Sequence, residues 1–175
     1  MKKYELVLDQ SIEVFGIKLF RIRALISFRS IKAGDIGGYI EKEKNLSQVY
    51  GNAWVYGNAQ VYGNAQVYGN AQVSGDARVY GDAQVYGNAQ VSGDAQVSGD
   101  ASLCWFSRVG SENGTLTAFT AKLGIQVTRG CFIGSIDEFE KSVIDKHGDS
   151  QVAKEYQLLI QFIRLRIPGG KGETI

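Results

Sequence analysis

The chain has 175 residues, 44% of them hydrophobic, and its 19 basic side chains nearly balance its 18 acidic ones. This composition excludes whole-chain disorder, and the lack of a basic excess argues against general nucleic-acid binding. No apolar stretch approaches the roughly 20 residues of a membrane span, and the first residues do not follow a signal-peptide pattern. Two cysteines, Cys104 and Cys131, are too few for a disulfide framework. We therefore expect a cytoplasmic protein without membrane contact.

Residues 1–48 are expected to form a β segment that caps the region after it. Residues 3–9 and 17–26 alternate like strands around a turn at Phe15 and Gly16. The alternation in the second strand slips at Phe20, which indicates a bulge or burial on both sides. The segment from Gly34 onward leads into the next region and would cover strand edges that are otherwise open.

Residues 49–103 carry a hexapeptide repeat. Nine hexads, from VYGNAW to VSGDAS, place a valine at every sixth position from Val49 to Val97, and Leu103 keeps the phase. A six-residue period fits neither an α-helix nor a coiled coil but is the signature of a hexapeptide β-helix. The valine and the alanine four residues later are expected to point inward, with Gly-Asn or Gly-Asp at the turns. Because no hexad buries its valine alone, the coils must stack.

This spacing resembles that of the left-handed parallel β-helix of hexapeptide-repeat proteins, in which three hexads make one 18-residue turn. The left-handed sense and the triangular cross-section are implications of that resemblance. The nine hexads then make three turns, and Leu46 with the segment before it adds a partial turn. We expect a mainly β protein with a short left-handed parallel β-helix of about three to four coils.

The 18-residue period also sorts the outward side chains into faces. Tyr50, Tyr68 and Tyr86 fall on one face and form a tyrosine ladder. Tyrosine offers a large contact area at low entropy cost, so the ladder is a candidate interface for self-association. The alternative is that the tyrosines only stack on one another along a solvated face.

Acidic residues repeat at the same period on the two other faces. The pairs Asp76/Asp94 and Asp82/Asp100 place like charges one strand apart, which is compatible with a cation site. Turn aspartates that bind local backbone amides account for the pattern as well. We take the second interpretation and expect no metal.

Residues 104–175 are expected to form an α+β unit with a mobile tail. Alternating residues on either side of Leu123-Gly124 predict a hairpin. Ser135 and Glu138 form a capping box that opens a helix, and Gly148 suits the end of that helix. The expected elements are a hairpin of strands 115–122 and 125–132, a helix over about 135–146 and a second helix over about 150–167.

The whole chain resembles a group of bacterial, phage and prophage proteins. These have a short N-terminal β segment, YGNA/SGDA hexads and a C-terminal unit with a WFS–VGS–NGTLT, TRGCF and HGD pattern. The group has no settled activity, so the resemblance implies the arrangement of the chain and a phage-type origin. The matching segments here are Trp105–Ser107, Val109–Ser111, Asn113–Thr117, Thr128–Phe132 and His147–Asp149.

The C-terminal unit is the candidate binding region, because aromatic and basic side chains gather there. Trp105 and Phe106 are suited to stacking on a planar ligand, and basic side chains to phosphates or carboxylates. The alternative is that the aromatic pair only plugs the β-helix and the arginines are solvated. The expected ligand-binding residues are Trp105, Phe106, Arg108, Lys122, Arg129 and His147.

An enzymatic function is the less favoured expectation. Hexapeptide-repeat acyltransferases resemble this chain only in the repeat, and their chemistry needs a general base, commonly histidine, on a coil. Residues 49–102 contain no histidine, and His147 lies outside them. A Cys131–His147 thiol–imidazole pair is a further alternative, although a small buried cysteine and a helix-terminal histidine explain both residues more simply. We expect no catalytic residue and no cofactor.

The expected function is therefore binding without catalysis. The phage resemblance suggests a counter-defence protein that sequesters a nucleotide-like signal without hydrolysing it. The rival is a structural or protein-binding scaffold that uses the tyrosine ladder. The expected partners are a second copy of the chain, with a trimer favoured by family analogy alone, and a nucleotide-like ligand or a host protein.

Overall fold

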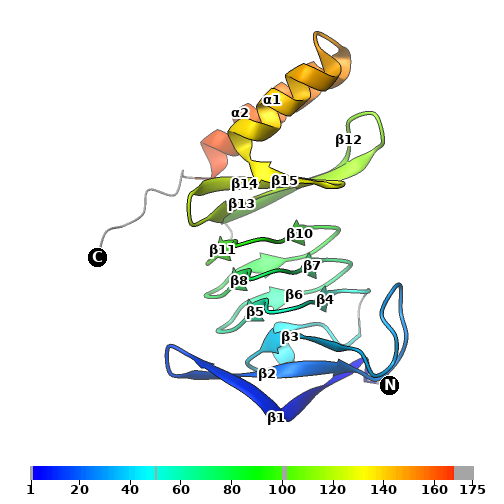
Figure 1. Ribbon diagram of the computed structural model, residues 1–175, viewed down its shortest axis with the longest axis vertical. Coiled ribbons are helices and arrows are strands. Elements are labelled where there is room, and N and C mark those ends of the chain that lie inside the picture. Colours follow the sequence, from blue (N-terminus) through cyan, green and yellow to red (C-terminus); the bar gives the residue numbers. More distant parts are fainter. Residues whose placement is uncertain (1, 50, 100–101, 168–175) are drawn as a thin grey trace.

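The computed structural model describes residues 2–49, 51–99 and 102–167. Three parts follow one another along the long axis in Figure 1: an N-terminal sheet, a parallel β-solenoid, and a C-terminal sheet covered by two helices. The protein is thus mainly β, with a solenoid of about three turns, as the hexads predict. The expected tail, 169–175, lies outside the described residues.

The N-terminal part is built from three strands. They are β1 (Tyr4–Val14), β2 (Ile17–Ala24) and β3 (Ile36–Ile40), and a short 3-10 helix, η1, spans Glu43–Asn45. β1 and β2 are antiparallel, with a register shift between Val7 and Ser11 where they face Arg21 and Phe20. The irregularity expected at Phe20 is therefore confirmed as a bulge, and its extra residues are on β1.

The solenoid consists of two-residue strands joined by glycine turns. Strands 18 residues apart pair in parallel, and the hexad glycines from Gly51 to Gly93 have φ between +57° and +69°, where a side chain would be strained. The strands are β4 (Trp54–Val55), β5 (Gln60–Val61), β6 (Gln66–Val67), β7 (Gln72–Val73), β8 (Arg78–Val79), β9 (Gln84–Val85), β10 (Gln90–Val91) and β11 (Gln96–Val97).

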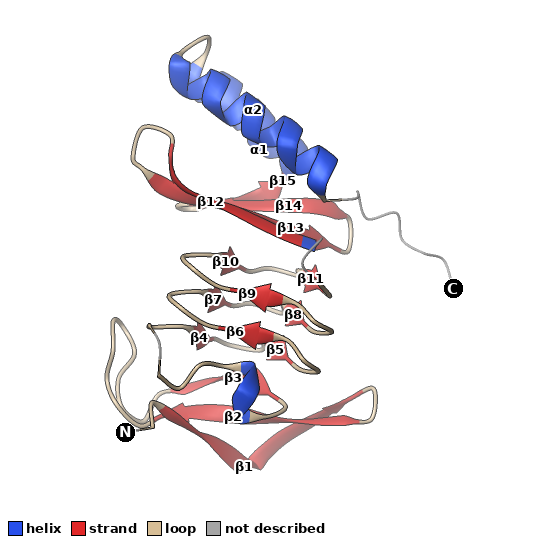
Figure 2. Cartoon of the chain, turned by 180° about the vertical axis from the view of Figure 1, so that it is seen from behind, coloured by secondary structure: helices blue, strands red, loops and turns tan. Residues whose placement is uncertain are grey.

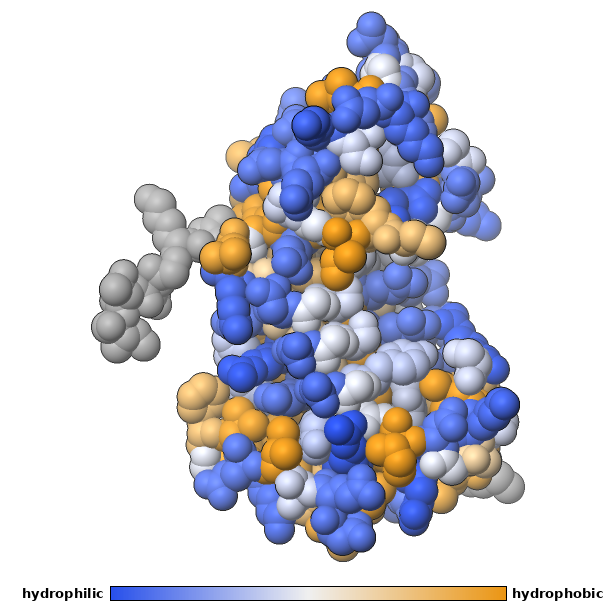
Figure 3. Space-filling view, viewed as in Figure 1, coloured by the Kyte–Doolittle hydropathy of each residue, from blue (hydrophilic) through white to orange (hydrophobic). Residues whose placement is uncertain are grey.

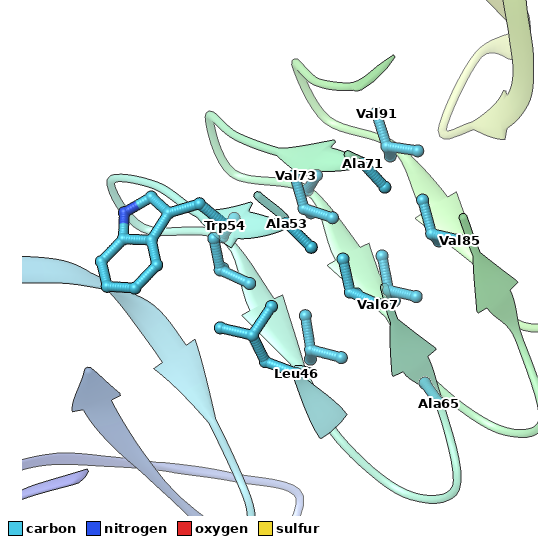
Figure 4. Packing of buried hydrophobic residues seen from close by; sticks show 14 of the residues in the cluster. Leu46, Ala53, Trp54, Ala65, Val67, Ala71, Val73, Val85 and Val91 are labelled. Atoms are coloured by element: carbon cyan, nitrogen blue, oxygen red, sulfur yellow. The ribbon is translucent and has the colours of Figure 1, made fainter. Parts of the chain in front are cut away.

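Valine and alanine line the interior of the solenoid. Every hexad valine from Val55 to Val97 is at most 1% exposed, and every hexad alanine from Ala53 to Ala95 is fully buried. Figure 4 shows these side chains meeting between the strands of successive coils. The prediction of an apolar interior with a period of six residues is confirmed over this range.

Val49 departs from the repeat, and its expected burial is wrong. Its side chain is 79% exposed. Leu46 takes the inward position instead: it is fully buried, it forms a parallel bridge with Val67, and the N–H of Ser47 donates to the Val67 carbonyl. Because Leu46 stands three residues before Val49, the step from the inward position to Ala53 is three residues longer than in the other hexads, and we call this extra length the three-residue insertion.

The expected partial turn before the repeat is present. β3 pairs in parallel with β5, so that Ile40 lies beside Val61 and extends the stack downward. The side chain of Gln48 binds the start of β1, accepting from the N–H groups of Lys3 and Tyr4 and donating to the Tyr4 carbonyl. The N-terminal sheet thereby covers the first coil.

Lys3 is buried where the N-terminal sheet meets the first coil. Its side chain donates to the Ala53 carbonyl at 3.0 Å and lies over the Phe28 ring. Lys3 is 4% exposed, and burial lowers the pKa of its ammonium group to about 8. A cation is therefore held in this contact with one hydrogen-bond acceptor and one aromatic face.

The C-terminal part is a four-stranded antiparallel sheet followed by two helices. The expected hairpin is present, and it gains a strand on each side. The chain turns at Gly130-Cys131, so the strand expected over 125–132 divides in two. The elements are β12 (Leu103–Val109), β13 (Gly114–Ala121), β14 (Gly124–Arg129), β15 (Phe132–Ser135), α1 (Ile136–His147) and α2 (Gln151–Arg166).

The first residues of both helices are capped as the sequence predicts. Ser135 accepts from the N–H of Glu138, whose side chain accepts from the N–H of Ser135, and this closes the capping box of α1. Gly148 ends α1 with φ +53°, and Ser150 caps α2. Of the helices in the described residues, neither combines the length and the apolar character that crossing a membrane requires.

The C-terminal sheet lies between the last coil and the helices (Figure 2). On β13, Phe119 is buried in the solenoid core, whereas Leu116 and Ala118 belong to the core formed with α1 and α2. Thr117 accepts from the N–H of Gln90 at 3.1 Å, and Thr128 donates to the Gln90 carbonyl at 2.8 Å. The sheet thus closes the open end of the solenoid.

Candidate functional site

The side chain of Arg129 lies at the centre of the candidate site. It leaves the end of β14, where Nε donates to the Tyr156 hydroxyl at 2.8 Å and Nη2 donates to the Val109 carbonyl at 2.9 Å. The guanidinium lies against Gly114, where an added Cβ would be 2.2 Å from Nη1. Contacts with α2 and β12 therefore fix the guanidinium that extends from β14, and Gly114 of β13 leaves the space for it.

A cavity of about 320 Å³ opens beside Arg129, between the β14–β15 turn and the two helices. We call it the Arg129 cavity. Phe139 packs between Phe132 and Tyr156, with ring centroids 5.2 and 5.3 Å away. The lining residues are Ser111, Glu112, Arg129, Gly130, Cys131, Phe132, Phe139, Ser142, Val143, Lys146, His147 and Tyr156.

Positive side chains outnumber negative ones around the Arg129 cavity. Arg129 and Lys146 line it, with His147 at the end of α1, and Glu112 is the one acidic residue among the lining residues. The His147 ring lies 6.1 Å from that of Tyr156, which also holds Arg129. This arrangement of cations and aromatic rings suits a ligand with an anionic group and a flat or apolar part.

Trp105 and Phe106, by contrast, line a different surface groove and not the Arg129 cavity. Trp105 meets the ring of Tyr86 edge-on at 4.2 Å, and Phe106 meets Phe162 of α2 edge-on at 5.7 Å. Both line a groove of about 450 Å³ that Arg166 also lines, and that we call the aromatic groove. The two rings therefore have protein partners already, as the plug interpretation expects for Trp105.

The remaining expected site residues lie away from both places. Arg108 is exposed in a bulge of β12, with φ +59°, and Lys122 is exposed in the β13–β14 turn, at the end of β14 opposite Arg129. The structure thus brings Arg129 together with His147, and Trp105 together with Phe106. It does not gather all six into one site.

Sequence reasoning missed several lining residues. Tyr156 lies on the buried face of α2, where its spacing reads as core, and Lys146 and Arg166 read as ordinary basic residues in a last helical turn. The S-x-x-E motif was the available signal, since it places Lys146 and His147 together at the end of α1.

The two cysteines differ in their surroundings. Cys131 is exposed, so its expected burial is wrong, because it lies in the β14–β15 turn. It lines the Arg129 cavity, as His147 does, but the described residues include no hydrogen bond between them. Cys104 is partly buried beside the aromatic groove, and burial raises the pKa of its thiol to about 11. Cys104 is therefore a neutral thiol at neutral pH.

Two of the solenoid turn aspartates, Asp76 and Asp82, accept hydrogen bonds from asparagines on the adjacent coil, whereas the buried Asp94 Oδ1 has no partner among the described residues. The side-chain amide of Asn58 donates to Asp76 at 3.4 Å, and that of Asn64 donates to Asp82 at 3.0 Å. Asp100, named in the cation alternative, lies outside the described residues. Within the described ranges, no three His, Cys, Asp or Glu side chains gather as metal ligands would.

Two tyrosine stacks run along the solenoid. Tyr68 and Tyr86 are parallel with centroids 5.0 Å apart, and Tyr62 and Tyr80 are parallel at 5.4 Å. Stacking along one face is what the alternative interpretation of the tyrosine ladder predicts. Tyr86 nevertheless keeps 38% of its surface exposed, and Tyr50, the first expected rung, lies outside the described residues.

Comparison with known families finds similarity in the repeat. A family model described as the YdcK beta solenoid repeat matches residues 47–63, 59–73, 65–81, 71–87 and 83–99. All of these segments precede β12, so the similarity supports a repeat β-solenoid protein and does not extend to the Arg129 cavity. No curated protein matches the chain.

Proposed function

We propose that the protein binds a small, anionic, nucleotide-like ligand in the Arg129 cavity and does not convert it. The observation that carries the proposal is the fixed guanidinium of Arg129, held by Tyr156 and the Val109 carbonyl at the edge of a cavity of about 320 Å³. That volume lies in the usual range for small-molecule sites, roughly 300–1,000 Å³.

The rest of the lining supports an anion with an aromatic or apolar part. An arginine that is already fixed loses little entropy when it binds a phosphate. Lys146 adds positive charge and His147 adds a ring nitrogen that can take part in a hydrogen bond, while Phe132, Phe139 and Tyr156 offer ring surface. A phosphate with a base or a sugar attached combines both properties.

The proposal also states that the bound ligand is not converted. The described solenoid residues 51–99 include no histidine, the side chain that most often serves as a general base. The enzymatic alternative remains acyl transfer, as in hexapeptide-repeat acyltransferases. Steady transfer of an acetyl group from acetyl-CoA by the purified protein would favour that alternative.

Calorimetric titration against a panel of cyclic dinucleotides and ADP-ribose-type compounds tests the proposal. We expect saturable heat with one class of compound, with the ligand recovered intact. Arg129→Gln should weaken binding at least about tenfold, because a hydrogen bond to a charged group is lost. Lys122→Gln is the matched control, since Lys122 is exposed at the far end of β14 and should bind like the original protein.

Two results would overturn the proposal. One is the absence of heat with every member of the panel, and the other is recovery of the ligand as hydrolysed product. The counter-defence role adds a cellular expectation: expression in a bacterium whose defence uses the bound signal should restore phage growth, and Arg129→Gln should not.

The second candidate function is a scaffold that self-associates through the tyrosine ladder. The 38% of the Tyr86 surface that stays exposed, although its ring stacks on Tyr68, favours it. Replacing Tyr50, Tyr68 and Tyr86 with serine should reduce the mass measured by light scattering from that of an oligomer to that of a monomer. The matched control is Tyr62→Ser with Tyr80→Ser, which removes the other stack; an unchanged mass in the ladder variant contradicts this function.

A further inference from the structure

Arg129 also lines a second cavity, separate from the proposed ligand site. This cavity has a volume of about 310 Å³ and lies where a corner of the solenoid meets the C-terminal sheet and the loop between β2 and β3. Its charged lining residues are two arginines, Arg29 and Arg129, and its other lining residues are asparagine, glutamine, threonine and glycine, with no carboxylate among them. Two cations without a counter-charge make this the most strongly cationic of the cavities described here.

Arg29 reaches the cavity from a loop whose tip is fixed at both ends. Phe28 and Ile31 exchange backbone hydrogen bonds at 3.0 and 2.9 Å, which close a tight turn, and Arg29 in that turn has φ +47°. The Phe28 ring packs on Trp54 at 5.5 Å, and Ile31 is buried. The arginine itself is exposed, and no hydrogen bond or ion pair within the described residues holds its side chain. The packing of the loop therefore fixes where along the solenoid the backbone of Arg29 lies, and leaves its side chain available to a ligand.

A ladder of asparagine amides ends at the same cavity. Asn70 Oδ1 accepts from the backbone N–H of Asn52 at 3.3 Å, and this fixes which atom of the Asn70 amide is the oxygen. Asn70 Nδ2 must then be the donor to Asn88 Oδ1, at 3.2 Å. Asn88 Oδ1 is therefore used as an acceptor, whereas Asn88 Nδ2 has no acceptor among the described residues, and the ladder polarises its N–H bonds.

On the opposite wall, Arg129 is positioned by the contacts already described. Its Nε and Nη2 atoms have protein acceptors, and Nη1 lies against Gly114, which lines this cavity next to Thr115. A second cation and a hydroxyl donor therefore face the corner that carries Asn88.

We propose that this second cavity, which we call the clamp site, binds a phosphoryl group between Arg29 and Arg129. Guanidinium groups pair well with phosphate oxygens, and uncharged donors such as Asn88 and Thr115 complete the shell of an oxyanion. The lining holds no acid that would repel the anion. The clamp site does not depend on a ligand in the Arg129 cavity, so it stands or falls separately from the proposed function.

The position of the clamp site has a mechanical consequence. Arg29 belongs to the N-terminal part and Arg129 to the C-terminal sheet, and the stacked coils set the distance between them (Figure 1). A phosphoryl group that bridges both arginines ties the two ends of the solenoid together. Binding to the folded state alone must then raise the unfolding temperature as the ligand concentration rises.

Thermal unfolding and calorimetry with inorganic phosphate and pyrophosphate, at constant ionic strength, test the clamp site. We expect saturable binding and a rise in the unfolding temperature. Arg29→Gln should weaken binding roughly tenfold or more. Lys32→Gln, which removes a charge from the same loop outside the cavity lining, should leave binding unchanged. Thr115→Val should weaken binding by a smaller factor, without loss of charge.

Further arms identify the source of the phosphoryl group and separate the two proposals. If free phosphate and pyrophosphate fail but adenosine 5′-phosphate binds and depends on Arg29, the phosphoryl group comes from an organic ligand and the clamp site is supported. His147→Gln should affect the nucleotide panel and leave phosphate binding intact, whereas Arg29→Gln should do the reverse. Absence of binding by all three probes, or equal effects of Arg29→Gln and Lys32→Gln, would overturn the clamp site.

Discussion

The solenoid and the C-terminal part use side chains in opposite ways. In the solenoid each residue meets its counterpart 18 positions away: valine lies beside valine, asparagine beside asparagine or aspartate, tyrosine beside tyrosine. In the C-terminal part, Arg129 meets a tyrosine from α2 and a carbonyl from β12. In the repeat, stacking pairs side chains of the same or a similar type. In the C-terminal part, contacts between different elements bring together charged, aromatic and polar side chains, and a binding site needs that combination.

The surface shows the same contrast. On the face drawn in Figure 3, a pale and blue band of polar residues covers the coils, while orange apolar side chains gather over the sheets at both ends. The repeat therefore acts as a rigid spacer with polar walls, and the parts at its ends supply the arginines that line the three cavities. Each of the following predictions bears on this contrast, beginning with the largest expected effect.

Introducing a carboxylate at a hexad valine tests whether burial in the structure, and not the hexad pattern alone, determines the loss of stability. Val73→Asp places an unpaired carboxylate among fully buried side chains and should destabilise the fold by roughly 4 kcal/mol or more. Val49→Asp is the same change at the same place in the hexad, yet Val49 is 79% exposed, so its cost should stay within about 0.5 kcal/mol. Urea unfolding measures both. Equal costs would show that Val49 is in the stack after all.

Phe119 joins the C-terminal sheet to the solenoid. Phe119 extends from β13 into the solenoid core and is fully buried there. Phe119→Ala should cost about 3–5 kcal/mol and separate the unfolding of the solenoid from that of the C-terminal part. Phe15→Ala, at a ring that is 82% exposed, is the control and should have little effect. A single unchanged transition in calorimetry for both variants would contradict a shared core.

A smaller effect is expected where the sheet binds the last coil. Thr117→Val keeps the shape but removes the acceptor of the Gln90 N–H, which should cost about 1–3 kcal/mol. Thr120→Val, on the same strand, has no such partner among the described residues and should be close to neutral. If hydrogen exchange of the Gln90 amide is equally slow in both variants, this hydrogen bond does not hold the sheet in place.

The smallest effect concerns Lys3. Its pKa is about 8 when folded, against an ordinary value of 10.5, so between these two pH values the unfolded chain binds more protons than the folded one. Stability should consequently rise with pH from about 8, until Tyr4, whose pKa burial raises above its usual value, begins to oppose the trend near pH 10. Lys3→Met should flatten the rise. Urea midpoints across this range that are identical in both proteins would contradict the burial of a charged Lys3.

The sequence was sufficient to predict whatever rests on period and on local capping. Valine every sixth residue predicts the coils, and Ser135 with Glu138 predicts α1, because both depend on near neighbours. The exception, Val49, shows the limit: Leu46 suits the same inward position, and the hexad pattern alone does not decide between the two. The structure decides it, because Leu46 is fully buried and Gln48, two residues later, forms hydrogen bonds to the start of β1.

The candidate sites were less predictable, because they depend on contacts between distant residues. Arg129 and His147 were expected together, but Tyr156, which holds one and neighbours the other, looked like a core residue. Arg29 stands in a loop without pattern, a hundred residues before Arg129, and only the stacked coils bring them to one cavity. No local sequence motif predicts a contact between residues so far apart in the chain.

The most direct test of the central claim is a crystal structure of the protein grown with whichever nucleotide of the panel gives heat. The account predicts ligand density beside Arg129 and Tyr156, with an unaltered solenoid. Ligand density on the Tyr68–Tyr86 face, with the Arg129 cavity free of ligand, would contradict it.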